Sequence, residues 1–384
     1  MNRYFTIILT IALLFSGCAV RNNGTPRVTS DTSAQATTSA DTTDAVDTTE
    51  AIDTTEPSDT TGIETTTEKE TTTEKISETV GQTTEPPITT PDETTEAITT
   101  TGAPTPEPQI GSISDTISSI SAKNAFVYNV TSDELLGKKG DGVNFSPASI
   151  TKLLTALYAL QSAPSDLVIA PQAEELSLVG KNSSIAYIKT HHKLTVSQLI
   201  QGMMMPSGND AAYALAAGVG RYIAGDPNLG GKDAVDLFMN GLNKYAESIG
   251  CNGTNFTVPD GLAGSEHYTS SHDMIIIGKL AISDPIISKY AKTVSQNVRY
   301  ASGHTITWNN SNSLINPNSE YYSPYVNGLK TGSLTGNYCV YVSAVINENT
   351  YLIGIFGSPT KNGRYDDAHV LIDTSLKNLK EAGE

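Results

Sequence analysis

Two side chains that could carry out acyl transfer lie three positions apart in the stretch NFSPASITKLLTALYAL, residues 144–160 of this 384-residue chain. Ser149 carries a hydroxyl and Lys152 an amine, and positions i and i+3 lie on the same face of a helix. A lysine can deprotonate a serine when burial, a like charge or a helix N-terminus lowers the lysine pKa. Alternatively, Ser149 only caps a helix while Lys152 reaches towards solvent, and the pair alone does not decide between these readings.

Two further polar clusters favour the catalytic reading. The tripeptide Ser-Gly-Asn at 207–209 precedes a predicted helix, and Lys-Thr-Gly at 330–332 comes at the end of a predicted strand. Ser-x-x-Lys, a Ser-x-Asn element and Lys-Thr-Gly, in this order, form the motif set of the penicillin-recognising serine enzymes. Each tripeptide is a weak signal by itself, but the three together strongly indicate an acyl-transfer site.

The sequence around these motifs resembles the D-alanyl-D-alanine carboxypeptidases, the low-molecular-mass penicillin-binding proteins. The resemblance covers roughly residues 115–375 and includes NFTVPDGLAGSEHYTSSHDM, between the second and third motifs. It implies an α/β (α+β) fold of the β-lactamase/transpeptidase type, with an antiparallel five-stranded sheet flanked by helices and a helical subdomain. It also implies a D,D-carboxypeptidase that removes the terminal D-alanine of peptidoglycan stem pentapeptides, is acylated by β-lactams and needs no cofactor or metal.

The same resemblance implies a role for each motif residue. Ser149 would be the nucleophile, Lys152 the general base, and Ser207 a relay for the proton. The residues expected to bind substrate are Asn209, Lys330, Thr331, Gly332 and Ser333.

The third motif is expected to hold the substrate carboxylate. Lys330 would attract it and lower the pKa of Lys152, Thr331 would donate a hydrogen bond to it, and Gly332 would leave room for the peptide along the strand edge. The backbone N–H groups of Ser149 and Ser333 would form an oxyanion hole. The family usually has a bulky residue and then Thr after this motif, whereas this chain continues Ser-Leu-Thr, so substrate preference in this corner stays open.

Strand-like segments lie at both ends of the region from residue 113 onward, with helical patterns between them. NAFVYNV and LLGKK predict a hairpin, and YVNGLKTG, YCVYVSAVI and TYLIGIFG predict three more strands. Thr195 and Gln198 have the spacing of a capping box, and Gly250 is placed to end a helix. A last helix is predicted through DDAHVLIDTSLKNLK. This order predicts one antiparallel sheet covered by helices.

The first 112 residues have a different composition. Residues 1–17 predict an export signal whose apolar run of about 18 Å is shorter than the roughly 30 Å core of a bilayer. LFSGC resembles a lipoprotein signal with Cys18 as the lipidated residue, although Phe15 departs from it and ordinary cleavage or a membrane anchor stay open. Residues 18–112 are rich in Thr, Glu and Asp and predict a disordered tether. The catalytic domain is therefore expected at 113–384, on the outer face of the cytoplasmic membrane or in the cell wall.

The net charge and the cysteine content limit the partners, disulfides and metal sites that we expect. The net charge is −17, and residues 21–110 alone hold 18 acidic and 4 basic residues, so the rest is close to neutral. Nucleic acid is not an expected partner because no basic patch is visible. Cys251 and Cys339 are expected as separate buried thiols rather than a disulfide. No Cys or His pair has zinc-ligand spacing, and His191-His192 is interpreted as a polar loop.

Four alternatives remain. A class A β-lactamase needs a Glu-x-x-Leu-Asn stretch that is absent between 209 and 330, and a Ser-His-Asp hydrolase lacks its Gly-x-Ser-x-Gly turn. A non-catalytic or slowly deacylating penicillin-binding sensor would stay acylated, whereas a carboxypeptidase would release D-alanine steadily. A D,D-endopeptidase could use the same residues.

Overall fold

The computed structural model describes residues 113–376. The predicted export signal, Cys18 and the tether lie outside the described residues. Within residues 113–376 no helix is both long enough and apolar enough to cross a membrane.

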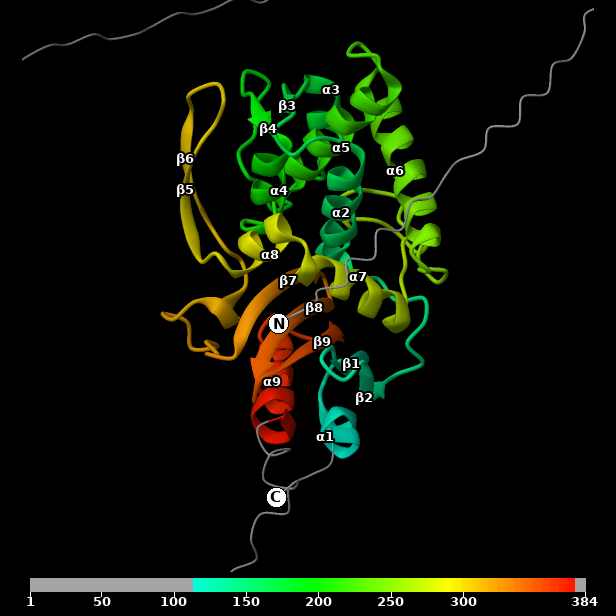
Figure 1. Cartoon of the computed structure of the whole chain (residues 1–384), viewed down its shortest axis with the longest axis vertical. Coiled ribbons are helices and arrows are strands. Elements are labelled where there is room, and N and C mark those ends of the chain that lie inside the picture. The colour runs from blue at the N-terminus through cyan, green and yellow to red at the C-terminus, as the bar shows by residue number, and fades with distance from the viewer. Residues whose placement is uncertain (1–112, 377–384) are drawn as a thin grey trace, which may run out of the picture. The chain divides into compact units, whose positions relative to one another are not determined.

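The centre of the fold is a five-stranded sheet with the order β2-β1-β9-β8-β7, in which every neighbouring pair is antiparallel (Figure 1). This confirms the predicted sheet and its hairpin. Because β7 is an edge strand, one of its sides has no neighbouring strand among residues 113–376. The strands are β1 (Asn124–Asn129), β2 (Glu134–Lys139), β7 (Val326–Leu334), β8 (Asn337–Ile346) and β9 (Asn349–Ser358).

Both faces of the sheet are covered by helices, as the apolar pattern of its strands requires. Along β8, Val340 and Val342 belong to one core cluster and Tyr341, between them, to the other. Alternation with a period of two sends neighbouring side chains to opposite faces. Helix α1 (Ile113–Ser119), helix α9 (Gly363–His369) and the π-helical turn η3 (Val370–Leu376) pack on one face. The predicted C-terminal helix is thus α9 and η3 as far as residue 376.

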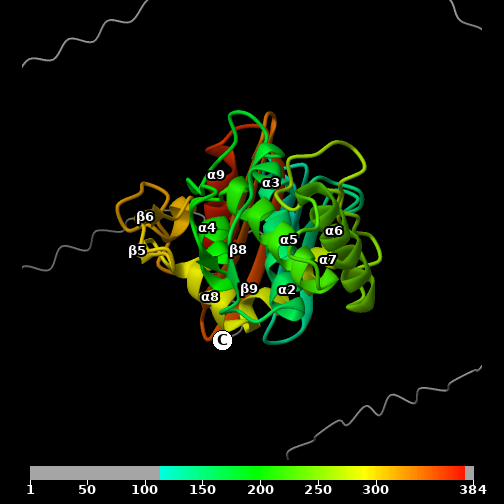
Figure 2. The same ribbon diagram turned by 90° about the horizontal axis from the view of Figure 1, so that it is seen from above.

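The other face carries the larger helical layer, whose upper part is the predicted helical subdomain (Figures 1 and 2). Two small two-stranded sheets lie beside it: β3–β4, whose strands are separated in sequence by α3, and the hairpin β5–β6. The elements are α2 (Lys152–Ser162), β3 (Val168–Ile169), α3 (Ala173–Ser177), β4 (Leu194–Thr195), α4 (Val196–Met204), α5 (Asn209–Ala224), α6 (Gly231–Ser248), α7 (Ser271–Ser283), α8 (Pro285–Lys292), β5 (Ser295–Arg299), β6 (Thr305–Asn309) and the 3₁₀ turn η2 (Ser313–Ile315).

Several local predictions can be compared with the helices. The capping box of Thr195 and Gln198 is present at the start of α4. Gly250 follows α6 with φ +92°, a backbone conformation that favours glycine, so it ends the helix as predicted. The helix at the nucleophile differs from the prediction, because Ser149 lies in a 3₁₀ turn, η1 (Ala148–Thr151), and α2 begins only at Lys152.

The prediction for the two cysteines is confirmed, whereas that for the histidine pair is met only in part. Cys251 and Cys339 are free and buried, as predicted. The interpretation of His191-His192 as a polar loop is met in part: both residues lie in a loop and His191 is exposed, but His192 is buried, and its ring stacks on His304 with 4.6 Å between ring centroids. The β5–β6 hairpin brings His304 to it, a long-range contact that local sequence does not reveal.

Candidate active site

The predicted nucleophile and base are in direct contact. The Nζ atom of Lys152 lies 2.9 Å from Ser149 Oγ, 2.8 Å from Asn209 Oδ1 and 2.8 Å from the backbone oxygen of Asp260. Ser149 Oγ also donates to that same oxygen at 3.3 Å. The 3₁₀ turn and the start of α2 therefore bring hydroxyl and amine together as the i, i+3 spacing predicted, although Ser149 precedes the α-helix.

Burial makes Lys152 suitable as a base. The side chain is fully buried, and desolvation lowers its pKa from 10.5 to about 8, while the carboxylates of Asp260 and Asp210 act in the opposite direction. Desolvation disfavours a charged group, which is why a buried ammonium loses its proton more easily. A substantial fraction of Lys152 is therefore neutral near pH 8 and able to accept the Ser149 proton.

The second and third motifs meet beside this pair. Ser207 has φ +62°, in the left-handed region, and its Oγ accepts a hydrogen bond from the Nζ of Lys330 at 2.9 Å. A serine held in this sparsely populated conformation is strained, and such strain tends to occur at functional sites. The turn at 207–208 also places Asn209 at the first position of α5, from which it reaches Lys152.

Lys330 is as buried as Lys152, and its environment is more positive. Burial lowers its pKa well below 10.5, and the charges of Lys152 and Arg364 lower it further. Burial is the main cause of the lowered pKa at both amines, and two positive charges disfavour each other's charged form, so the expectation that Lys330 lowers the pKa of Lys152 stays a prediction. Lys152 differs because two carboxylates offset its loss of solvent.

The third motif lies on the edge strand β7, against the turn that carries the nucleophile. A Cβ at Gly332 would come within 2.8 Å of the Pro147 oxygen and 3.2 Å of the Ser149 nitrogen, so only glycine permits this approach. Thr331 is buried, and its Oγ1 lies 2.9 Å from the Oγ of Ser311.

Arg364, on α9, contacts the end of β7 that carries Ser333. Its Nη1 donates to Ser333 Oγ at 2.8 Å, to the Gly332 oxygen at 2.7 Å and to the Cys339 oxygen at 3.3 Å. Arg364 could not be predicted from the sequence, because it lies more than thirty positions after the third motif and only the folded sheet brings it back to that motif. It adds a buried positive charge behind the strand that carries the third motif.

Two further residues that the sequence analysis did not assign hold the nucleophile turn. The backbone oxygen of Asp260 accepts from both Ser149 and Lys152, as described above. His267 Nδ1 accepts from the Thr257 backbone N–H, so its Nε2 carries the proton and donates to Thr151 Oγ1 at 2.8 Å. Burial, and then the Lys152 charge, lowers the His267 pKa to about 4, which keeps this ring neutral. Both residues lie in the stretch already noted between the second and third motifs.

The motif residues open onto a cleft of about 420 Å³. Ser149, Asn209 and Ser333 line it directly, whereas the remaining motif residues, Lys152, Ser207, Lys330, Thr331 and Gly332, are buried. The cleft is also lined by Lys181, Asn182, Ser183, Ser184, Gly261, Leu262, Leu334, Thr335 and Tyr338. All eight predicted site residues thus belong to one site.

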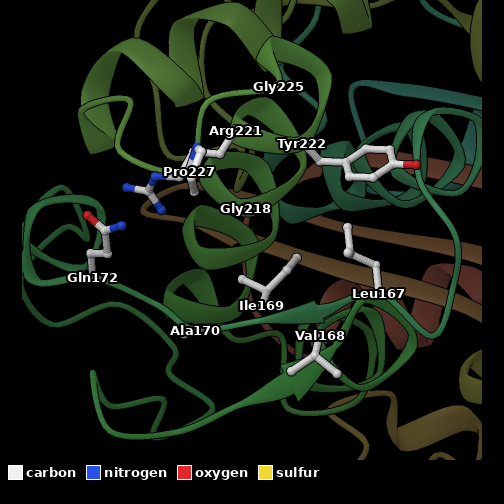
Figure 3. A pocket seen from close by; sticks show the side chains of 10 residues that line it. All are labelled: Leu167, Val168, Ile169, Ala170, Gln172, Gly218, Arg221, Tyr222, Gly225 and Pro227. Atoms are coloured by element: carbon white, nitrogen blue, oxygen red, sulfur yellow. The ribbon is translucent and has the colours of Figure 1, made fainter.

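A second cavity, of about 500 Å³, lies in the helical layer, but its chemistry is different (Figure 3). Its walls are mainly apolar, with Ile169, Val168 and Tyr222 among the side chains around it. The charged Arg221 at its edge is held by Glu175 and is not directed at a nucleophile. We therefore assign the candidate active site to the smaller cleft at Ser149, where the polar groups converge.

Comparison with known proteins agrees with this assignment. The curated D-alanyl-D-alanine carboxypeptidase DacF of Bacillus subtilis (strain 168) is 27% identical over 263 residues, which are 67% of this chain and 63% of that protein. DacA of Escherichia coli (strain K12), of the same description, is 28% identical over 269 residues, 67% of this chain and 61% of that protein. The chain thus spans less than two thirds of the length of these relatives.

Solved structures show the same fold. The DD-transpeptidase of Streptomyces K15 superposes with a TM-score of 0.58 at 26% identity, covering 66% of this chain and 97% of that one. A D-alanyl-D-alanine carboxypeptidase from Mycobacterium tuberculosis H37Rv superposes with a TM-score of 0.56 at 23% identity, covering 67% of this chain and 91% of that one. At this identity the likeness supports the fold alone. The five-stranded antiparallel sheet with its helical subdomain is therefore the predicted β-lactamase/transpeptidase-like fold.

The fold and the three motifs thus define a catalytic domain of the penicillin-recognising type. The protein-family model described as D-alanyl-D-alanine carboxypeptidase (Peptidase_S11) matches residues 111–360 of this chain. The chain therefore belongs to the D-alanyl-D-alanine carboxypeptidase family, as its motifs had predicted.

Proposed function

We propose that this protein is a serine D,D-carboxypeptidase that removes the terminal D-alanine from stem pentapeptides of peptidoglycan and is acylated by β-lactams. The observation that carries the proposal is the contact between Lys152 Nζ and Ser149 Oγ at 2.9 Å, with Lys152 fully buried. Membership of the family supports the substrate, and the polar cleft beside Ser149 supports a peptide as ligand.

In the proposed acylation, neutral Lys152 takes the hydroxyl proton of Ser149, and Ser149 Oγ attacks the carbonyl carbon between the two D-alanines. Backbone N–H groups of Ser149 and Ser333 stabilise the oxyanion that forms. The carbon–nitrogen bond then breaks, and the departing amine receives a proton through Ser207. D-alanine leaves, and the stem remains as an ester on Ser149.

Lys330 and its neighbours receive the terminal carboxylate in this proposal. An anion close to a lysine favours the charged form, so the carboxylate raises the lowered pKa of Lys330 as it binds. Thr331 donates a hydrogen bond to the carboxylate, and Asn209 holds the peptide backbone. Once D-alanine has left, a water molecule attacks the ester with Lys152 again as base, which frees Ser149.

The test is release of D-alanine from a synthetic stem pentapeptide by the purified chain, beside its Ser149→Ala variant. Steady release over many turnovers by the wild type, and loss of at least a thousandfold in the variant, is expected because removing the nucleophile leaves only binding and oxyanion stabilisation. A single burst equal to the enzyme concentration would instead indicate a slowly deacylating sensor. Full activity in the variant would disprove the role of Ser149.

For the N-terminal region we propose that residues 1–17 are an export signal, that Cys18 is lipidated and that residues 18–112 tether the catalytic domain at 113–384 to the outer face of the membrane. The sequence LFSGC and the Thr-, Glu- and Asp-rich composition support this proposal. Such a tether of about 90 residues would have an end-to-end distance of roughly 50–60 Å. Cys18→Ser should move the protein from the membrane to the soluble fraction, and unchanged membrane association would refute lipidation.

A further inference from the structure

Resting on the proposed function, we infer that the cleft selects stem peptides that carry a free carboxylate upstream of the two D-alanines, and that Lys181 is the residue that recognises it. A stem peptide offers two such groups: the α-carboxylate of a γ-linked glutamate at its second position, and the side-chain carboxylate of a diamino dicarboxylic acid at its third. Both present the same chemistry to a lysine.

The charge on the walls of the cleft carries the inference. Of the described residues that line it, Lys181 is the only one charged at neutral pH, and none of them is an aspartate or glutamate. The amines of Lys152 and Lys330 are buried and are used by the reaction. Lys181 is exposed, and among residues 113–376 no carboxylate lies within salt-bridge distance of it. Its ammonium is therefore available to a ligand.

The second motif holds the loop that carries Lys181. The backbone N–H of Asn209 donates to the Ser184 oxygen at 2.8 Å, and the buried carboxylate of Asp210 accepts from the Ala186 N–H at 2.7 Å. The residue that contacts Lys152 and the loop that presents Lys181 are thus fixed to each other by the start of α5. Only the Lys181 side chain itself has to be ordered when a substrate binds.

The other side of the same loop packs against the opposite wall of the cleft. Ser183 Oγ donates to the Gly180 oxygen at 2.7 Å, and a Cβ at Gly180 would lie 2.5 Å from Leu262 Cδ2, so the loop is in close contact with that side chain. Leu262 lines the cleft two positions after Asp260, whose oxygen contacts Ser149. Lys181 therefore stands at a fixed place relative to the nucleophile.

The distance along the peptide suits this arrangement. Consecutive Cα atoms across an ordinary peptide bond are about 3.8 Å apart, and a γ-linkage is two carbons longer, so the third residue lies within roughly 6 Å of the reacting carbonyl and the second within roughly 12 Å. A cleft of about 420 Å³ that contains both Ser149 and Lys181 has the size to hold that segment. A cation at its wall attracts an anionic peptide and disfavours one whose third residue ends in an amine without a carboxylate.

The test compares kcat/KM for three pentapeptides: one with both carboxylates free, one amidated at the third residue and one amidated at the second. The wild type is expected to prefer the first at least fivefold over one amidated form, chiefly through KM, with the preference shrinking as salt rises. That preference should fall to about one in Lys181→Gln, reverse in Lys181→Glu and persist in Lys181→Arg. Lys189→Gln, an exposed lysine of the same loop that does not line the cleft, is the matched control and should keep the wild-type preference.

The position of the effective amidation identifies which carboxylate Lys181 recognises, and either result supports the inference. Equal kcat/KM for all three peptides in the wild type would overturn the inference and leave the proposed function standing, because D-alanine is still released. A preference that survives in Lys181→Gln would also overturn it. Failure to hydrolyse any of the peptides would overturn the proposed function and the inference with it.

Discussion

Lys152 is a residue whose chemistry depends on its surroundings more than on its type. Full burial lowers its pKa to about 8, and the hydrogen bonds to Ser149 and Asn209 aim its nitrogen at the hydroxyl. The base must be neutral to act, so kcat/KM should rise about tenfold per pH unit below pH 8 and level off above it. A pH–rate profile on a peptide with no group that titrates between pH 6 and 9 tests this, and a flat profile over that range would contradict it.

Asn209 offers a second test of the same amine. Asn209→Asp places a carboxylate about 2.8 Å from Lys152 Nζ, and an opposite charge at that distance raises a lysine pKa by about 1–3 units. The acid limb of the pH–rate profile should therefore move to higher pH, and activity at pH 7 should fall more than activity at pH 10. An unshifted limb would mean that Lys152 does not set the pH dependence.

At the scale of elements, the edge strand β7 must approach the nucleophile turn closely. Gly332→Ala would bring a Cβ to 2.8 Å from the Pro147 oxygen, so the strand or the turn has to move. Misplacement of reacting groups by about 1 Å can cost about 10²-fold in rate, and we expect a loss of that order in kcat/KM. Gly264→Ala, where a Cβ meets open space, is the control. Equal effects of the two substitutions would refute this role of the close approach.

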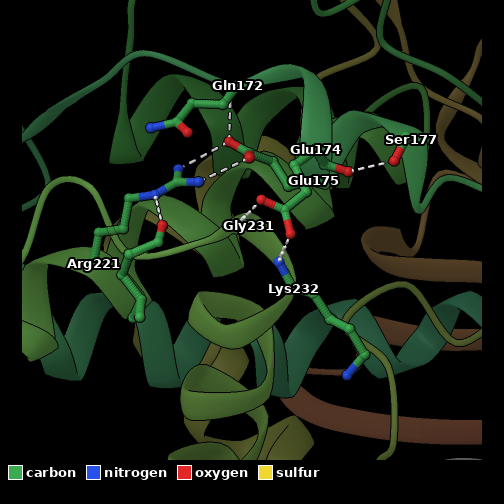
Figure 4. A network of polar contacts seen from close by, with 8 residues as sticks. Gln172, Glu174, Glu175, Ser177, Arg221, Gly231 and Lys232 are labelled. Carbon is green, nitrogen blue, oxygen red and sulfur yellow. Dashed lines mark hydrogen bonds and ion pairs between the residues drawn. The ribbon is translucent and has the colours of Figure 1, made fainter. Parts of the chain in front are cut away.

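A buried ion pair links two helices of the helical layer, α3 and α5 (Figure 4). Arg221 on α5 donates two hydrogen bonds to Glu175 on α3, at 3.0 and 2.9 Å, and a third to the Leu229 oxygen. Glu175→Ala leaves a buried charge without its partner, which should lower the free energy of unfolding by about 3–5 kcal/mol.

Urea denaturation measures this loss. Asp236→Asn, which removes the exposed pair with Lys232, is the control and should change stability by less than about 1 kcal/mol. A loss below about 1 kcal/mol in Glu175→Ala as well would show that the buried pair does not stabilise the layer.

At the scale of the whole molecule, sequence predicted the parts that depend on local pattern. The strands of the sheet, the α4 capping box and the three motifs were all visible in residue spacing. Arg364 and His192 were not, because their partners come from distant segments brought together by the sheet and by the β5–β6 hairpin. The 3₁₀ turn at Ser149 was missed for a related reason: it is held by His267, more than a hundred positions away.

The central claim is that Ser149 forms an acyl-enzyme, and covalent labelling tests it most directly. The purified chain is incubated with a fluorescent penicillin, and intact mass and peptide mapping locate the adduct. We predict one penicillin per chain on the peptide that contains Ser149, none in Ser149→Ala, and normal labelling in Ser162→Ala, a serine at the end of α2. An adduct in folded Ser149→Ala, or none in the folded wild type, would contradict the account.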